Sequence, residues 1–480
     1  METNTITEEQ QIAYSALLSE KQKADVILTE EQQKAYDTLL TGNNCFITGD
    51  AGVGKSFVLN KYIEDMKKIN KNVIVTSPTG VAASNIGGTT IHRAFGYPTS
   101  PVIVEDKINI DDIEITDTKN QDNKAYNIYS IRKCFSVADI IVIDEISMVR
   151  IDLFDLFCFQ LKCIENRTEG RHIQIIISGD FNQLPPVMTD KDRKILSQRY
   201  PNLGSGFAFQ SQNWSKLNLH NIFLHEIIRQ SDALFIQANK CLKEGNMNII
   251  PWFNRNIVNR WDNETLVLCP TNAEARSINE NRLNNIDSEE YIYTEYIEGD
   301  KIYDSDRHND PVVKLKVGAR VMSIVNDKES RYANGNIGII LEISDKMFHT
   351  VKVRFDNGNT CDIDYYDWPI YDYDVVDGRV VAKQVSTISQ IPLKLAYAIT
   401  IHKCQGQTYD RVAIKPDSIF SYGQLYVAMT RCKSLSGIQL VSDIPERVKV
   451  HSEKYNKDFT FPIKLADKNV IMFYQGLKEE

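Results

Sequence analysis

The sequence predicts an α/β protein with two doubly wound units, each built around a parallel sheet. Strand-like and helix-like segments alternate from residue 43 to 180, a glycine-rich loop joins the first strand to the first helix, and the alternation returns after residue 219. Continuous apolar, β-branched runs suit strands that are buried on both faces of a parallel sheet. A chain of 480 residues has room for roughly two to four domains.

Four apolar runs are expected to form the strands of the first unit. They are Cys45–Thr48, Val73–Thr76, Ile140–Ile143 and Ile173–Ile177. After the first of them, Phe57–Lys68 carries apolar residues at helical spacing. The pattern breaks between Pro98 and Asn127, where the acidic, weakly periodic stretch Glu105–Asn123 indicates an insertion.

The second unit is expected to start near Leu219, with a strand at Leu266–Cys269. From about residue 291 to 389, apolar and polar residues alternate around turn signals such as Asn334-Gly335. This pattern predicts a small β-rich insert. Helical and strand signals resume at Leu393 and run to about Val441.

The N-terminus holds a short internal repeat. Ile6–Leu18 is echoed by Leu28–Leu40, and both copies have the form of a helix with a threonine N-cap and a glutamine three residues on. A single recent duplication explains the repeat, which is too short for a solenoid. The expected domains are a duplicated segment (1–27), a first unit (28–218, with an insertion at about 93–130), a second unit (219–290 and 390–445), its β-rich insertion (291–389) and a C-terminal tail (446–480).

Composition excludes several classes of protein. No apolar run is long enough to cross a bilayer, and the polar, acidic start is unlike a secretory signal. The nine cysteines are scattered without a Cys-x-x-Cys pair, which favours reduced thiols over a zinc site. A net charge of −9 counts against a protein that coats DNA but allows a narrow basic channel. We expect no membrane partner and an intracellular location, cytoplasmic or nucleoid in a bacterium or phage, with the nucleus left open.

A phosphate-binding loop is the strongest local signal. Gly49–Ser56 fits the pattern G-x-x-x-x-G-K-[ST], follows an apolar strand and opens a helix. Glycines let backbone N–H groups turn toward phosphate oxygens, and the helix N-terminus adds its positive end. Lys55 would neutralise the β- and γ-phosphates, and Ser56 would hold magnesium. The alternative is a glycine-rich turn with a surface lysine, which this context disfavours.

Acidic and amide side chains follow the later strands of the first unit. Asp144 and Glu145 end the strand Ile140–Ile143, where carboxylates face the ligand crevice of an open α/β sheet. Asp144 would bind magnesium through water, and Glu145 would orient and deprotonate the attacking water. Gln183 follows the next strand, where a γ-phosphate sensor is expected. A solvated acidic turn and an exposed amide in a proline-stiffened loop are the competing interpretations.

Taken together, these segments resemble the superfamily-one DNA helicases of the PIF (petite integration frequency) group, to which RecD and the phage Dda helicase are related. The matching segments, in family order, are Gly49–Ser56, Pro78–Ala83, Thr90–His92, Asp144–Met148, Gly179–Pro186, Glu226–Gln230, Leu315–Ala319 with Asn334-Gly335, Thr400–Thr408 and Tyr426–Arg431. Two residues depart mildly from the family pattern, because Cys404 stands where serine or alanine is common and Asn182 where an aromatic residue is frequent.

The resemblance implies an ATP- and Mg²⁺-dependent helicase that moves 5′→3′ on single-stranded DNA and unwinds duplex DNA at junctions. It implies two RecA-like domains, with a small wedge in the first and a small β-barrel in the second. Carried onto this chain, it assigns roles to several residues. The expected nucleotide contacts are Gln32, Gly49, Ala51, Gly52, Val53, Gly54, Lys55, Ser56 and Gly406, with Arg229 and Arg431 facing ATP from the second domain. The expected DNA contacts are Thr79, Thr90, His92, His402, Lys403 and Thr408.

General chemistry supports some of these roles and leaves others open. A guanidinium from a second domain would stabilise charge on the transferring phosphoryl group, although an arginine taken alone is more often in a surface ion pair. The histidines at 92 and 402 could equally be structural. Phe95 and Tyr97 could stack on bases, but packing is the expected role. Gln32 lies 17 residues before Gly49, which favours it over its repeat partner Gln10 for reading adenine, while closure of a capping box is the competing role.

Two other functions fit part of the sequence. The same motor could move along RNA, since these motifs do not reveal recognition of a 2′-hydroxyl. A P-loop ATPase could also act as a switch or loader without moving, although such a protein would not need the motifs Thr400–Thr408 and Tyr426–Arg431.

Overall fold

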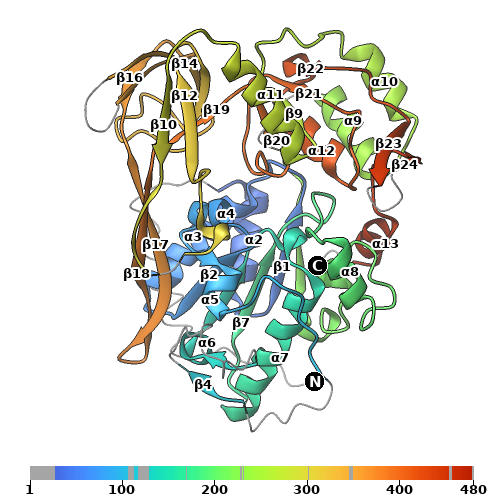
Figure 1. The fold of residues 1–480 in the computed structure, drawn as a ribbon. Coiled ribbons are helices and arrows are strands. Elements are labelled where there is room, and N and C mark those ends of the chain that lie inside the picture. The colour runs from blue at the N-terminus through green and yellow to red at the C-terminus, as the bar shows by residue number, and fades with distance from the viewer. Residues whose placement is uncertain are drawn as a thin grey trace.

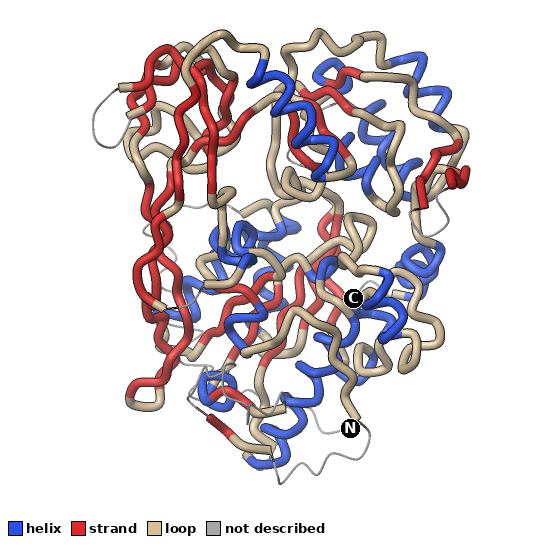
Figure 2. Tube along the Cα trace, in the orientation of Figure 1, coloured by secondary structure: helices blue, strands red, loops and turns tan. Residues whose placement is uncertain are grey.

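The computed structural model describes residues 28–105, 113–116, 129–168, 170–227, 230, 232–300, 302–344, 350–452 and 457–477. Figure 1 shows three regions: a lower α/β unit, a second α/β unit at the upper right and a β-rich region at the upper left. Figure 2 shows that helices cover the sheets of the two α/β units, whereas strands dominate the third region. The duplicated segment 1–27, with Gln10, lies outside the described residues.

The first unit contains a six-stranded sheet, parallel throughout, in the order β3-β2-β6-β7-β1-β8. Its strands are β1 (Cys45–Gly49), β2 (Val73–Ser77), β3 (Thr89–Thr90), β6 (Ile140–Ile143), β7 (Gln174–Ser178) and β8 (His220–Leu224). The four predicted apolar runs all form strands of this sheet, and each boundary differs from its prediction by at most one residue. The prediction of an α/β fold with a parallel sheet is therefore confirmed.

Strand β8 corrects the predicted start of the second unit. Residues 220–224 pair with β1 in parallel register, Cys45 opposite His220 and Gly49 opposite Leu224. The apolar run after Leu219 thus completes the first sheet and does not open the second one. Its local pattern suits a buried strand in either sheet, so only the long-range pairing decides its place.

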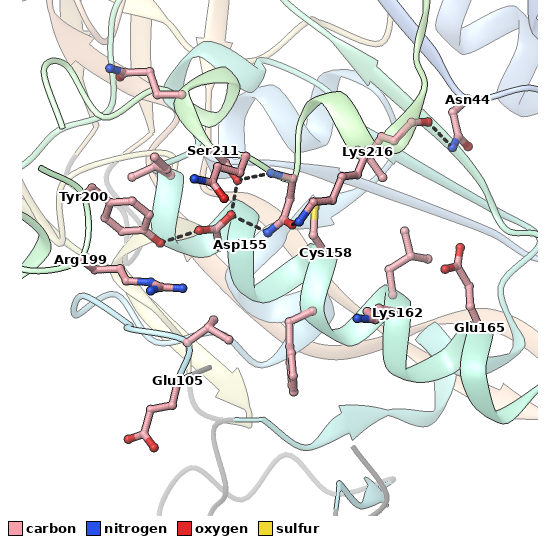
Figure 3. Close-up of a pocket in the computed structure, with 18 of the residues that line it drawn as sticks. Asn44, Glu105, Asp155, Cys158, Lys162, Glu165, Arg199, Tyr200, Ser211 and Lys216 are labelled. Carbon is pink, nitrogen blue, oxygen red and sulfur yellow. Dashed lines mark hydrogen bonds between the residues drawn. The ribbon is translucent and has the colours of Figure 1, made fainter. Parts of the chain in front are cut away.

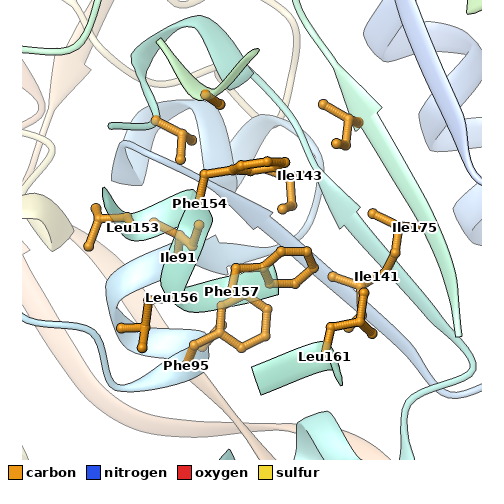
Figure 4. Close-up of a cluster of buried hydrophobic side chains, with 14 of the residues drawn as sticks. Ile91, Phe95, Ile141, Ile143, Leu153, Phe154, Leu156, Phe157, Leu161 and Ile175 are labelled. Carbon is orange, nitrogen blue, oxygen red and sulfur yellow. The ribbon is translucent and has the colours of Figure 1, made fainter. Parts of the chain in front are cut away.

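Helices cover both faces of the first sheet. They are α2 (Glu30–Leu40), α3 (Lys55–Lys68), α4 (Gly80–Asn85), α5 (Ile91–Phe95), α6 (Lys133–Val137), α7 (Ile151–Arg167) and α8 (Asp190–Leu196). On one face, Phe154 and Phe157 of α7 pack toward Ile141 and Ile175 of the sheet (Figure 4). Burying side chains of this size supplies most of the stability of such a layer, typically about 1.5–3 kcal/mol each.

The second unit has a four-stranded parallel sheet in the order β20-β9-β21-β22. Its strands are β9 (Val267–Cys269), β20 (Ala398–Thr400), β21 (Val412–Ile414) and β22 (Ile438–Leu440), and its helices are α9 (Ala233–Lys243), α10 (Ile249–Asn256), α11 (Asn272–Asn284) and α12 (Gln424–Met429). The chain leaves this unit after α11 and returns at β20, so the residues between them form a separate region.

That β-rich region holds a five-stranded antiparallel sheet in the order β16-β15-β14-β13-β19. Its strands are β13 (Arg320–Ser323), β14 (Ile337–Ile343), β15 (Val351–Phe355), β16 (Thr360–Ile363) and β19 (Leu393–Leu395). Beside it, β10 (Glu290–Thr294) pairs with β12 (Val312–Lys316), and β11 (Tyr296–Gly299) pairs with β18 (Arg379–Gln390). Strand β17 (Tyr366–Val376) completes a long hairpin with β18.

The β17–β18 hairpin reaches from the β-rich region back to the first unit, as the left side of Figure 1 shows. The hydroxyl of Tyr373 accepts from the backbone N of Val75 at 2.9 Å and donates to its carbonyl oxygen at 3.2 Å. Asp372 forms a buried ion pair with Arg132, 2.6 Å between Oδ1 and Nη1. The β-rich region is therefore joined to the second unit by the chain and to the first unit by these hydrogen bonds and this ion pair.

Two further segments complete the described chain. In the predicted insertion, β4 (Ile115–Thr116) pairs with β5 (Ile131–Arg132), and most of the acidic stretch lies outside the described residues. The predicted tail instead forms a hairpin, β23 (Arg447–Ser452) with β24 (Lys457–Pro462), followed by helix α13 (Lys468–Gly476). All nine cysteines are free thiols. Within the described part of the chain, no helix is long and apolar enough to span a membrane.

Candidate nucleotide and DNA sites

The glycine-rich loop joins β1 to α3 at the carboxyl edge of the first sheet. A Cβ atom on Gly49 would lie 2.2 Å from the carbonyl oxygen of Leu224 in β8, so only glycine allows this approach. The Lys55 ammonium curls back over the loop and donates to the carbonyl oxygens of Gly49 at 2.8 Å and Asp50 at 3.1 Å. A cation held over the first turn of a helix favours a phosphate anion at the same place.

The residues expected to hold magnesium lie together. The Ser56 hydroxyl at the start of α3 donates to Oδ2 of Asp144 at 3.4 Å. Burial raises the pKa of Asp144, while Lys55 and hydrogen bonds oppose the shift. A hydroxyl and a carboxylate are the hard oxygen donors that Mg²⁺ prefers, and such sites take their other ligands from phosphate and water. The donor set therefore fits magnesium, even though the described residues contain no group of three or more His, Cys, Asp or Glu that could hold a metal.

Glu145 has the properties of a general base. Its backbone adopts the left-handed conformation with φ of 51°, which is unusual outside glycine and marks sites where strain serves function. Burial, with a contribution from neighbouring Asp144, raises the pKa of Glu145 to about 7. A carboxylate with its pKa near the working pH is matched to proton transfer.

Gln405 of the second unit reaches into this cluster. Its Nε2 donates to Oε2 of Glu145 at 3.2 Å and to Oε1 of Gln183 at 3.2 Å. One amide thus joins the candidate base and the candidate γ-phosphate sensor. Gln183 is 6% exposed, so it is not the exposed amide of the competing interpretation.

The two units touch closely beside these residues. Gly423, just before α12, lies against the backbone after β7, where an added Cβ would be 2.4 Å from the carbonyl oxygen of Gln183. Tyr426 of α12 directs its hydroxyl to the backbone N of Ala51 and to Oδ1 of Asp50, both at 3.5 Å. Lys243 of α9 forms an ion pair with Asp50. No site role was expected for Gln405, Tyr426 or Lys243, because only the packing of the two units brings them to the site residues of the first unit.

The two candidate arginines differ. Arg431 is 1% exposed, and its guanidinium donates to the carbonyl oxygens of Val427 at 2.9 Å and Gln407 at 3.1 Å, all within the second unit. It is therefore not in a surface ion pair, and in this conformation it supports the turn that carries Gln405. Its positive charge also lowers the pKa of Glu145, against the larger effect of burial. Arg229 lies outside the described residues.

Gln32 closes the predicted capping box and also contacts the phosphate loop. Its Oε1 accepts from the backbone N of Thr29 at 3.2 Å, which closes the capping box at the start of α2. Its Nε2 donates to the carbonyl oxygen of Val53 in the phosphate loop at 3.2 Å. Its buried side chain thus links α2 directly to the nucleotide site.

A cavity of about 670 Å³ separates the first unit from the second unit and the β-rich region. Five of the predicted site residues line it, namely Thr79, Glu145, His402, Lys403 and Gly406. Gly406, which was expected at the nucleotide, is exposed in the same wall as Glu145. Burial lowers the pKa of His402.

The β-rich region adds residues to this cavity that no sequence motif predicted. Trp368 of β17 stacks on His308 with ring centroids 5.5 Å apart and planes within 9°. Burial lowers the pKa of His308 to about 4, with a contribution from Lys394. The pKa of Lys394 falls to about 8, mainly through burial and also through Lys403. An aromatic pair beside two lysines suits the binding of single-stranded DNA. The alternation of apolar and polar residues along these β-strands did not predict the pair.

The remaining predicted DNA contacts are buried or half-buried. Thr90 is 1% exposed and caps α5 by accepting from the backbone N of Arg93 at 3.3 Å. His92 is half-buried, with Nδ1 3.2 Å from the carbonyl oxygen of Tyr97. Phe95 and Tyr97 are buried in the core, which confirms their expected packing role. Thr408 is half-buried and follows the turn of His402. The structure thus gives Thr90 and His92 structural partners.

A further cavity, of about 980 Å³, lies between α7 and the segment 199–217, away from both sites (Figure 3). Asp155 occupies its centre, where it accepts from Tyr200 at 2.7 Å and Asn213 at 2.9 Å and also from Ser211. Because these three partners satisfy the hydrogen-bonding capacity of the Asp155 carboxylate, the cluster has a structural role, which is to hold the segment 199–217 against α7.

Comparisons with known proteins match this arrangement. Residues 27–250 match the PIF1-like helicase family, and residues 395–438 match the UvrD-like helicase C-terminal domain. The ATP-dependent DNA helicase Pif1 of Campylobacter jejuni is 30% identical, with 91% of this chain and 95% of the relative covered. PIF1 of Danio rerio is also 30% identical, with 92% of this chain but only 63% of the relative covered.

Solved structures agree. Pif1 from a Bacteroides species, in complex with ADP-AlF4, is 33% identical, with 94% and 97% of the two chains covered and a TM-score of 0.74. Pif1 from Candida albicans is 27% identical, with coverages of 95% and 100% and a TM-score of 0.65. Because a Pif1 relative is 30% identical over nearly the whole of both chains and residues 27–250 match the family model, the chain belongs to the Pif1 family of ATP-dependent DNA helicases.

Proposed function

We propose that this helicase moves 5′→3′ along single-stranded DNA and unwinds the duplex ahead of it, using ATP hydrolysed between two RecA-like domains. The first and second α/β units would be these domains. The segment at about 93–130 would be the wedge, and residues 291–389 would form the inserted barrel. Relatives support the DNA substrate, since Bacteroides Pif1 has been solved bound to single-stranded DNA and a further Pif1 structure concerns DNA unwinding at forked double-stranded DNA.

The observation that carries the proposal is the pair of hydrogen bonds from Gln405 to Glu145 and Gln183. Gln405 belongs to the second unit, whereas both of its partners belong to the first. Movement of the two units apart would break these hydrogen bonds, and closure of the units would form them again. Hydrolysis would then depend on the relative position of the units, which is how a motor couples chemistry to movement.

At the nucleotide, each residue would have a separate task. Lys55 would neutralise the β- and γ-phosphates, and Ser56 and Asp144 would hold Mg²⁺, which supplies charge stabilisation when bound. Glu145 would orient water and accept its proton, while Gln183 would contact the γ-phosphate. Arg229 and Arg431 would add positive charge from the second domain as it closes. Gln32 would read the adenine edge.

The DNA would run through the 670 Å³ cavity between the units. Lys403, 48% exposed on its side chain, pairs with the exposed Asp310 at 3.5 Å and would exchange this partner for a backbone phosphate. Trp368 and His308 offer stacked rings beside the path. A narrow channel of this kind reconciles DNA binding with a net charge of −9.

Strand displacement on matched duplexes with either a 5′ or a 3′ single-stranded tail tests the proposal. We expect unwinding from the 5′ tail with ATP, and none with the Lys55→Ala variant. Unwinding from the 3′ tail alone would contradict the direction. Equal ATPase stimulation by single-stranded RNA and DNA would favour the RNA motor, and ATPase without displacement from either tail would favour a non-motor switch.

A further inference from the structure

The C-terminal segment connects the two α/β units a second time. Ile463 and Leu465 are buried in the core of the second unit, and the Leu465 carbonyl oxygen accepts from the backbone N of Gly423 at 3.2 Å. Two residues later, Asp467 accepts a hydrogen bond from Ser205 of the first unit and caps α13. Residues 463–477, here called the strap, therefore cross the boundary between the units. They lie outside both family matches.

Helix α13 is packed firmly on the first unit, beside α8 in Figure 1. Val470 is 1% exposed in the same core cluster as the aromatic residues of α7. Phe473 stacks on Phe209 at 4.3 Å and meets Phe181 edge-on at 5.3 Å. This packing fixes the helix, so the residue after Phe473 has a defined direction.

That residue, Tyr474, directs its hydroxyl into the base of the nucleotide site. The hydroxyl lies 2.8 Å from Oγ1 of Thr48, which directly precedes Gly49 of the phosphate loop. It accepts from the backbone N of Phe181 at 3.1 Å and donates to Oδ1 of Asp180 at 3.4 Å. One oxygen thus joins the end of β1 to the loop that leads from β7 to Gln183.

The partners of Tyr474 are themselves buried and ordered. Thr48 is 0% exposed and Asp180 is 1% exposed. Oδ1 of Asp180 also accepts from the backbone N of Asn182 at 3.0 Å and from its side chain at 2.9 Å, which shapes the turn just before Gln183. Burial and the nearby Asp180 raise the pKa of Tyr474 well above its ordinary value, so the hydroxyl keeps its proton for this network.

We propose that Tyr474 is a positioning residue for ATP hydrolysis. Its hydroxyl fixes the position of the phosphate loop relative to the loop that carries Gln183. The strap connects this contact to the second unit. The inference rests on the proposed roles of the phosphate loop and of Gln183. Its physical basis is that a displacement of about 1 Å in a catalytic group costs up to about 100-fold in rate, even when substrate binding survives.

The test uses the full chain carrying Tyr474→Phe, which removes the hydroxyl and keeps the ring. ATPase activity is measured across ATP concentrations at saturating single-stranded DNA. We expect kcat to fall about 10-fold while KM for ATP stays within about twofold. Thr48→Val, which removes the other hydroxyl of the pair, should have a similar effect. The double variant should lose little more than either single variant, because both changes break one contact.

Met472→Ala is the matched control, since its side chain lies on the same helix but is 68% exposed. It should keep the wild-type kcat. A wild-type kcat in Tyr474→Phe, additive losses in the double variant, or an equal loss in Met472→Ala would each overturn the proposal. If Tyr474→Phe does not fold, Thr48→Val alone decides, and a normal kcat there overturns it. Failure of the proposed nucleotide site is distinct, because Lys55→Ala would then retain ATPase activity.

Discussion

Gln405 donates from Nε2 to Oε2 of Glu145 at 3.2 Å, across the boundary between the two α/β units. The candidate base is therefore held by a residue of the other unit. Oε1 of the same Gln405 side chain is buried without a hydrogen-bond partner among the described residues. A buried amide oxygen left unpaired is costly, which makes this contact sensitive to any ligand that enters the cleft.

Replacing the base separates binding from chemistry. Glu145→Gln keeps the shape of the side chain but cannot accept a proton, so hydrolysis should fall about 10²- to 10⁴-fold. Binding of a fluorescent ATP analogue with Mg²⁺ should stay close to wild type. If nucleotide affinity fell as much as turnover, Glu145 would be a ligand and not the base.

The rate of hydrolysis should depend on pH through the same residue. Burial and Asp144 raise the pKa of Glu145 to about 7, and the base works only as the carboxylate. Below this pKa the residue takes up a proton, so kcat should fall about tenfold per pH unit, with a plateau above it. The residual activity of Glu145→Gln should lack this inflection. A flat wild-type profile between about pH 5.5 and pH 8 would exclude the assignment.

Gln32 should determine preference among nucleotides. Gln32→Ala removes the link from α2 to Val53 of the phosphate loop, so ATP binding should weaken and the preference for ATP over other nucleoside triphosphates should relax. Gln33→Ala is the matched control, because the Gln33 side chain donates to Asp37 on the exposed surface of the same helix. Deletion of residues 1–27 should leave ATPase activity nearly unchanged. A relaxed preference in Gln10→Ala but not in Gln32→Ala would show that the first repeat is the working one.

Lys403 should contribute one phosphate contact to DNA binding. Lys403→Ala should weaken single-stranded DNA binding for all base sequences alike, and the slope of log affinity against log salt should become shallower by about 0.7. Lys34→Ala, at an exposed position on α2, is the control and should change neither value. An unchanged salt slope in Lys403→Ala would remove this residue from the DNA path.

Local sequence patterns predicted the first unit well. Ile140–Ile143 is a continuous apolar run that only a doubly buried strand suits, and Gly49–Ser56 has a spacing that few structures other than a phosphate loop require. The positions of Lys55, Ser56 and Asp144 follow from these two elements because parallel strands end at one edge of the sheet.

Long-range packing could not be predicted in the same way. Residues 220–224 suit a strand in either unit, and only pairing with β1 assigns them to the first sheet. Tyr373 and Tyr474 each carry a hydroxyl across a unit boundary, yet neither has a local spacing that marks it. The helix-capping hydrogen bond of Thr90 is a further feature that the family pattern did not indicate.

ATPase activity of Gln405→Ala at saturating single-stranded DNA tests most directly whether the second unit completes the hydrolytic site. Gln407→Ala, two residues along the same turn, is the control, because its side chain bonds to Tyr409 and its carbonyl oxygen can still hold Arg431. We expect Gln405→Ala to lower kcat at least about tenfold with little change in ATP affinity, and Gln407→Ala to stay near wild type. Wild-type kcat in Gln405→Ala would contradict the account, because hydrolysis would then proceed without the contact that joins the two units.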